Sequence, residues 1–374
     1  MRQPRIFAPV HHPKAFYHCV SRTVGQEFLL GPEEKEQFVT YMRAYETLYA
    51  VRVVSFCIMS NHFHILLEVP KRPETLPSDA ELIALTRQAQ GNDAADALEK
   101  TIQGYYDSGD TTALDAFRAS ITDRMWSVST YMKTLKQRFT QWYNRRKKRT
   151  GTMWSARYHS VLVEHEGRAL KKMASYIDLN PVRAKMCDDP KDYRWCSYAE
   201  AVAGKTLALE SLYYLTTVSN AGGLKPDEFC PSNQKESLEM WRRILYGVPE
   251  HPAHAREYLR RQRKGEQIRK QCNSEADYDI LHTTYRRIPR EKALEVLAKG
   301  GSLSSAELLS CRVRYFCDGA ALGSKSFVEE IFQTHREKFG KTREDGARKI
   351  KGLLQEASDH ALHTLRDFRK EVIT

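Results

Sequence analysis

The stretch from Met59 to Glu68 is the feature that most constrains how this chain can fold. It follows an apolar run and carries the residues typical of a β-strand, in which positions i and i+2 lie on the same face. We therefore expect His62 and His64 side by side on one face of a sheet, with Phe63 on the other. Two imidazoles on a rigid backbone can hold a divalent metal ion. The alternative for so short a pattern is a pair of ordinary half-buried histidines.

The charge balance of the chain favours an acidic partner. Its 374 residues include 59 Lys and Arg against 47 Asp and Glu, which gives a net charge of +12. This excess is typical of nucleic-acid-binding proteins, and the alternative is a basic protein without a polyanion partner. The eight cysteines form no Cys-x-x-Cys pair, which argues against a zinc ribbon or a redox motif. No apolar run matches a membrane span or a signal peptide, so we expect a cytoplasmic protein without a membrane partner.

Hydrophobic periodicity predicts an α+β fold for the first half of the chain. The expected order is strand 15–24, helix 32–49, strand 51–59, the histidine strand to about Val69, helix 124–149 and strand 158–164. This order is that of a ferredoxin-like arrangement, an antiparallel sheet with helices on one face. The opposite face is then open to hold a site with His62 and His64, and His18 on the first strand is a further candidate for it.

Composition divides the chain into three parts. Residues 1–204 are expected to form the main domain, with residues 71–122 as an insertion of one or two short helices. Residues 205–250 are expected to be an appendage and linker, and residues 251–374 a basic, all-α C-terminal region. Its expected helices are a basic one within 251–272 and others at 290–299, 304–315, 324–337 and 342–374. Short helices with glycine turns are typical of a helix-turn-helix module, and the alternative is a bundle for packing or dimerisation, in a monomer or a homodimer.

The predicted helix 124–149 concentrates positive charge. Its basic residues are Lys133, Lys136, Arg138, Arg145, Arg146, Lys147, Lys148 and Arg149, with aromatic residues between them and no acid. Basic side chains neutralise phosphates, and aromatic faces stack on unpaired bases. We therefore expect this helix to contact a nucleic-acid backbone, the alternative being a solvated face over a core stripe.

The predicted helix 166–179 supplies a further group of polar side chains. Its buried stripe is expected to consist of Leu170, Met173, Ala174 and Ile177. Lys172, Tyr176 and Asn180 follow one another at successive turns on a flank of this stripe. Asn180 offers an amide oxygen to a metal ion, and Lys172 a charge to a phosphate. The alternative is a boundary tyrosine with a half-buried ring.

Four motifs occur in order along the chain. They are Ser60-Asn61-His62-Phe63-His64-Ile65-Leu66-Leu67-Glu68, Trp154-Ser155-Ala156-Arg157-Tyr158, Tyr176-Ile177-Asp178-Leu179-Asn180-Pro181-Val182-Arg183-Ala184 and Asp192-Tyr193-Arg194-Trp195-Cys196-Ser197-Tyr198. Together they resemble the single-tyrosine HUH transposases, in particular the REP-associated tyrosine transposases, over residues 15–200 without the insertion. The resemblance implies a ferredoxin-like HUH endonuclease core. It also implies His62 and His64 as metal ligands, Tyr176 as the nucleophile and Asn180 as the third ligand.

The function implied is that of a metal-dependent single-stranded DNA endonuclease and strand transferase. It would act beside DNA hairpins through a 5′-phosphotyrosine intermediate, with Mg²⁺ or Mn²⁺ as the cofactor. Arg157 and the basic helix would hold the DNA backbone. One alternative is a non-catalytic nucleic-acid-binding regulator on the same fold. Another is a relaxase or replication-initiator nickase, which often carries a second tyrosine that the Tyr176 helix lacks.

Overall fold

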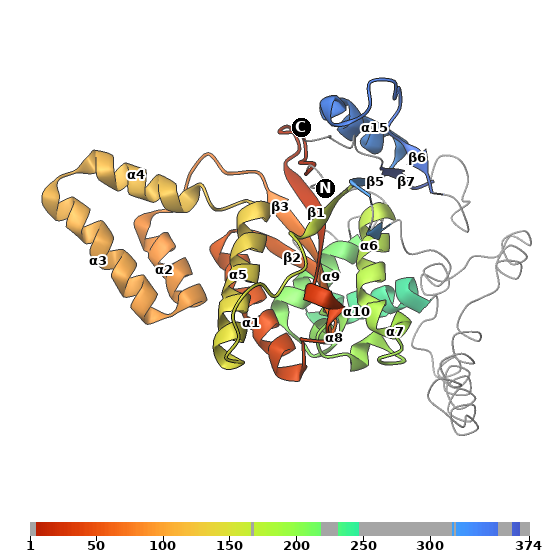
Figure 1. The fold of residues 1–374 in the computed structure, drawn as a ribbon, viewed down its shortest axis with the longest axis horizontal. Coiled ribbons are helices and arrows are strands. Elements are labelled where there is room, and N and C mark those ends of the chain that lie inside the picture. The colour runs from red at the N-terminus through yellow and green to blue at the C-terminus, as the bar shows by residue number, and fades with distance from the viewer. Residues whose placement is uncertain are drawn as a thin grey trace, which may run out of the picture. The chain divides into compact units, whose positions relative to one another are not determined.

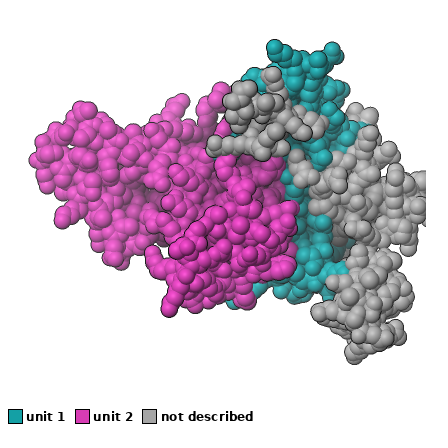
Figure 2. Space-filling model, viewed as in Figure 1, with its two compact units in different colours: residues 1–6, 161–374 teal, residues 7–160 magenta. Residues whose placement is uncertain are grey.

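The computed structural model describes residues 5–165, 168–217, 231–246, 316–317, 319–350 and 361–366. The chain divides into two compact units, one of residues 7–160 and one of residues 1–6 and 161–374 (Figure 2). Among the described helices, none has both the length and the apolar character that crossing a membrane requires.

The first unit is built on a three-stranded antiparallel sheet in the order β2-β3-β1. Its strands are β1 (Lys14–Arg22), β2 (Arg52–Ile58) and β3 (His62–Pro70), and its two sheet-covering helices are α1 (Pro32–Leu48) and α5 (Val128–Arg146). Phe63 of β3 packs against Phe38 of α1, which in turn meets Phe139 of α5, so both helices cover the Phe63 face (Figure 1). The adjacent side chains of β3, His62 and His64, lie on the opposite face.

Three helices follow β3 and form the insertion, where one or two were expected. They are α2 (Asp79–Gln90), α3 (Asn92–Ser108) and α4 (Thr111–Thr122), which extend from the sheet in Figure 1. Ser78 begins α2 with a capping box in which its side chain and that of Glu81 satisfy each other's backbone N–H groups. Gly109 takes a left-handed conformation with φ of 69° at the end of α3, where a side chain would be strained.

The second unit combines helices with short strands. Its helices are α6 (Arg168–Asp178), α7 (Asn180–Arg183), α8 (Ser197–Val202), α9 (Thr206–Thr217), α10 (Pro231–Tyr246) and α15 (Lys325–Thr334). Its strands are β4 (His159–Val163), β5 (Ala321–Gly323), β6 (Arg348–Lys349) and β7 (His363–Leu365). The division between the units falls within β4, whose residues from Val161 onward belong to the second unit. Strand β5 pairs in parallel with β4 and antiparallel with β7, and β7 pairs with β6.

The α+β class is confirmed, but the C-terminal region is not all-helical. The helix expected at 324–337 is present as α15, whereas the described parts of 342–374 form β6 and β7 in place of a helix. The physical reason is strand pairing: β7 forms backbone hydrogen bonds with β5 on one side and with β6 on the other. The helices expected within 251–272 and at 290–299 and 304–315 lie outside the described residues.

Candidate active site

Three histidines gather on the sheet face opposite to the one that α1 and α5 cover. His62 and His64 of β3 lie with their ring centroids 5.1 Å apart, and the ring of His18 stacks on that of His64 at the same separation. In the β1–β3 register His18 is opposite Leu66 and His64 is opposite Val20, so His18 and His64 are diagonal neighbours on one face. We call His18, His62 and His64 the histidine cluster.

The environment of His62 suits a metal ligand. Burial, and then the nearby Arg22 guanidinium, lowers the pKa of His62 to about 4, so its imidazole is neutral at pH 7. Its Nδ1 lies 2.6 Å from Oδ1 of Asn61, whose own amide nitrogen donates to the carbonyl of Gln26. With Asn61 oriented in this way, Nδ1 of His62 carries the proton and donates it. The lone pair is then on Nε2, as in histidines that bind metals through one nitrogen and are held by the other.

His18 engages the other member of the predicted pair. Its Nε2 lies 2.9 Å from Nδ1 of His64, and both side chains are buried. One nitrogen donates and the other accepts, so this hydrogen bond fixes the ring of His64 and directs its Nε2 away from His18. The sequence placed His18 on the first strand, but the contact depends on the β1–β3 register, which periodicity alone does not give.

Tyr176 belongs to the second unit, and among the described residues Phe316, Cys317 and Arg183 lie against its side chain. Its ring stacks on Phe316 with centroids 5.1 Å apart and planes 10° apart, and the Arg183 guanidinium lies 5.3 Å from its centroid. Its hydroxyl is 3.0 Å from Sγ of Cys317. Only 3% of the residue is exposed, and this burial, followed by the contact with Cys317, raises the pKa of Tyr176 above its ordinary value. Phe316 and Cys317 were not among the predicted site residues.

The two other predicted side chains of this helix also have defined surroundings. Asn180 is buried, and its Nδ2 donates to the backbone carbonyl of Tyr176 at 3.0 Å, which leaves Oδ1 as the atom it would offer to a ligand. Burial, with a smaller effect from Arg168, lowers the pKa of Lys172 to about 8. Because Asn180 and the histidine cluster belong to different units, their convergence on one ion stays a prediction.

Asp178 is a buried acid two residues after Tyr176, and it was not among the predicted site residues. Its carboxylate accepts hydrogen bonds from Ser197 Oγ (2.6 Å), the Tyr198 backbone N–H (3.2 Å) and Trp241 Nε1 (2.9 Å). Burial nevertheless raises its pKa to about 6. These bonds attach α8 and α10 to the end of α6, two residues after Tyr176. The signal available was an acid that directly follows Ile177, the last residue of the expected buried stripe.

The basic residues predicted to bind a backbone have two kinds of surroundings. Lys133, Arg138, Arg145, Lys148 and Arg157 are exposed, and Arg149 is partly so. Arg146 and Lys147 form ion pairs with Glu33 and Glu34 of α1. Lys136 donates to the Ala156 carbonyl at 2.9 Å and lies over the Trp154 ring, and burial lowers its pKa to about 8. The basic helix contains no acid, but two acids of α1, distant in sequence, thus neutralise part of its charge.

Fold and site define the chain as an α+β protein with a histidine cluster on a sheet face in one unit and a tyrosine-bearing helix in the other. Comparison with protein-family models and with curated proteins found no match. Among solved structures, the chain is similar to a REP-associated tyrosine transposase bound to a REP hairpin, with 11% sequence identity and a TM-score of 0.35. The match covers 54% of this chain and 86% of that one.

Proposed function

We propose that the chain is a metal-dependent single-stranded DNA endonuclease and strand transferase that acts beside DNA hairpins. The observation that carries the proposal is the pair of β3 imidazoles on one sheet face, each with its Nδ1 in a hydrogen bond. In the tautomer in which Nδ1 of each ring donates that bond, Nε2 is the nitrogen that each ring would offer to a metal ion. The motif resemblance supplies the reaction class, with Tyr176 as the nucleophile.

The donor set fits a divalent ion of the Mg²⁺ or Mn²⁺ kind. Neutral imidazoles suit Mn²⁺ more than Mg²⁺, and the amide oxygen of Asn180 would add a ligand that both ions accept. When bound, such an ion neutralises charge on the scissile phosphate and makes phosphorus a better electrophile. The chain's own contribution is to keep His62 neutral at pH 7 and to fix both rings before the ion arrives.

The covalent step belongs to Tyr176. Its phenolic oxygen would form a bond to phosphorus while the bond from phosphorus to the 3′ oxygen breaks. The phenolic proton would end on that oxygen, so the products are a 5′-phosphotyrosine and a free 3′-OH. The Arg183 guanidinium beside the ring and the ammonium of Lys172 one turn earlier would stabilise the negative charge that develops. Attack by the 3′-OH of another strand reverses the step and completes strand transfer.

The test is the formation of a covalent adduct. Wild type, Tyr176→Phe and Tyr193→Phe are incubated with a labelled single-stranded hairpin DNA and Mn²⁺ or Mg²⁺, then separated by denaturing electrophoresis. We expect an adduct with wild type and with Tyr193→Phe, which alters a buried tyrosine of the same unit. We expect none with Tyr176→Phe or with EDTA. An adduct that persists in Tyr176→Phe would show that another residue is the nucleophile.

A second candidate function rests on one observation, the enclosure of Tyr176. A tyrosine that is 3% exposed, with its pKa raised by burial, is a poor nucleophile in that conformation. This favours a non-catalytic nucleic-acid-binding regulator on the same fold. That function predicts hairpin binding without an adduct for every hairpin tested, with affinity unchanged in Tyr176→Phe.

A further inference from the structure

The residues that enclose Tyr176 come from a distant part of the chain. Phe316 and Cys317 follow the tyrosine by about 140 positions, yet one stacks on its ring and the other meets its hydroxyl. Phe316 is itself buried, with 2% of its surface exposed. Arg183, whose side chain is exposed, has its guanidinium 5.3 Å from the centroid of the same ring. Of these neighbours, Arg183 is the one that solvent reaches readily.

The chain that follows these two residues is firmly attached near α6. The Ala320 carbonyl accepts from the Leu162 backbone N–H at 2.9 Å, and β5 then pairs in parallel with β4. Glu164 accepts from both the N–H and the hydroxyl of Ser324, the residue that caps α15. Gly323 fits tightly here, because a Cβ would lie 2.8 Å from that of Glu164. These contacts hold the segment after Cys317 to the strand that precedes α6.

This arrangement conflicts with nucleophilic attack. An attacking tyrosine oxygen needs free space on the side where phosphorus arrives, and Cys317 occupies a position 3.0 Å from that oxygen. The stacked ring of Phe316 also restricts movement of the tyrosine ring toward a phosphate.

We propose that Phe316 and Cys317 form a cover that holds Tyr176 in a resting conformation, and that binding of the DNA phosphodiester displaces it. The proposal rests on the proposed function, because it assigns a regulation to the same tyrosine. Arg183 is the exposed charge that a phosphate would meet first, since a guanidinium pairs well with phosphate oxygens. Cys317 and Phe316 hold the nucleophile in place and take no part in the chemistry.

The first test measures the rate of adduct formation in variants of the cover. Phe316→Ala and Cys317→Ala are expected to form the adduct about three- to tenfold faster than wild type. In wild type, the stack of Tyr176 on Phe316 and the contact of its hydroxyl with Cys317 must be broken before attack, and each substitution removes one of these contacts. Cys317→Ser, which keeps a polar group beside the tyrosine, is expected to stay near the wild-type rate. Cys187→Ala, which alters another partly exposed cysteine of the unit, is the control. Equal or slower rates in both alanine variants would overturn the proposal.

The second test needs no reaction on DNA. Wild-type protein is treated with iodoacetamide with and without hairpin DNA, and alkylation of each cysteine is followed by peptide mass spectrometry. We expect DNA to accelerate alkylation of Cys317 at least severalfold, with Cys187 unchanged. Unchanged alkylation of Cys317 would overturn the cover even if adducts form. Accelerated alkylation without any adduct would support the cover and count against the nuclease function.

Discussion

Burial raises the pKa of both Tyr176 and Asp178, two residues of the same helix, but their surroundings differ. Asp178 accepts three hydrogen bonds that attach α8 and α10, whereas the hydroxyl of Tyr176 meets a thiol. Asp178 therefore serves to hold the helix in its place, and its titration affects stability. Tyr176 is held by its ring stack on Phe316 and by the contact of its hydroxyl with Cys317.

The pKa of Asp178 makes the stability of the second unit depend on pH. Its folded-state pKa of about 6 lies above the ordinary value of 3.8, so between these values the native state keeps a proton that the unfolded chain loses. The contribution of Asp178 is fully present below about pH 4 and is lost as pH rises through about 6. We expect the difference in unfolding free energy between wild type and Asp178→Asn to shrink by up to about 3 kcal/mol over this range.

This prediction is checked by urea denaturation at several pH values. Other carboxylates titrate in the same range, so the quantity compared is the difference between the two proteins. A difference that stays constant from about pH 4 to about pH 7, or that grows with pH, would mean that Asp178 is not protonated in the folded state at pH 5.

Sequence periodicity predicted residue positions well where a single strand or helix decides them. The shared face of His62 and His64 and the buried stripe Leu170, Met173, Ala174 and Ile177 of α6 are confirmed. The contacts of His18 with His64 and of Cys317 with Tyr176 could not be predicted. The first depends on strand register and the second on the pairing of β4 with β5, and neither leaves a periodic pattern in the sequence.

Helices and strands with a long periodic pattern were also predicted, whereas strands that depend on distant partners were not. Helices α1, α5 and α6 and strands β1, β2 and β3 lie within a few residues of their predicted positions, because each carries a long periodic pattern. Strands β5, β6 and β7 have two or three residues each, too few to show alternation. Their existence depends on partners elsewhere in the chain, so the C-terminal region was wrongly expected to be entirely helical.

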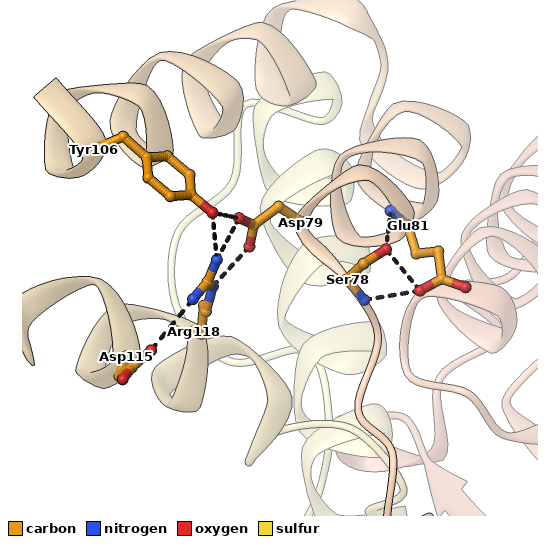
Figure 3. Close-up of polar contacts among 6 residues, drawn as sticks. All are labelled: Ser78, Asp79, Glu81, Tyr106, Asp115 and Arg118. Atoms are coloured by element: carbon orange, nitrogen blue, oxygen red, sulfur yellow. Dashed lines mark hydrogen bonds and ion pairs between the residues drawn. The ribbon is translucent and has the colours of Figure 1, made fainter. Parts of the chain in front are cut away.

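The insertion is held together by a polar network that joins its three helices. Arg118 of α4 donates to both carboxylate oxygens of Asp79, the first residue of α2, and to the hydroxyl of Tyr106 on α3 (Figure 3). Its side chain is about one-third exposed and that of Asp79 is 18% exposed, so this pair is less screened than one fully in solvent. Arg118 also lowers the pKa of Asp79.

Loss of this network is expected to weaken the insertion measurably. Arg118→Ala should lower the free energy of unfolding by about 1 kcal/mol and speed amide hydrogen exchange in α2, α3 and α4. The control is Arg87→Ala, which removes an ion pair with Asp96 whose members are 46% and 66% exposed, and should change stability by less than about 0.5 kcal/mol. Equal effects of the two substitutions would show that the network adds nothing beyond surface pairing.

For the molecule as a whole, the net charge of +12 predicts that DNA binding depends strongly on salt. Each neutralised phosphate of a single strand contributes about −0.7 to the slope of log affinity against log salt. Arg145→Ala, which removes an exposed charge, should reduce that slope by about 0.7. Arg146→Ala should reduce it less, because Arg146 is already paired with Glu33.

Fluorescence anisotropy with a labelled single-stranded hairpin, repeated at several salt concentrations, measures these slopes. The adjacent arginines make a matched pair on one helix, so a difference between them reports their surroundings. Identical slopes for wild type, Arg145→Ala and Arg146→Ala would mean that the end of α5 does not contact the DNA backbone.

The parallel pairing of β4 with β5 also sets the order in which the molecule is completed during synthesis. Strands β1, β2 and β3 lie within the first 70 residues and can form their antiparallel sheet early, because their connections are short. Strand β5 begins at Ala321, about 160 residues after the strand that it joins. Tyr176 therefore leaves the ribosome long before Phe316 and Cys317 do, and a nascent chain carries its tyrosine helix without the side chains that later enclose it.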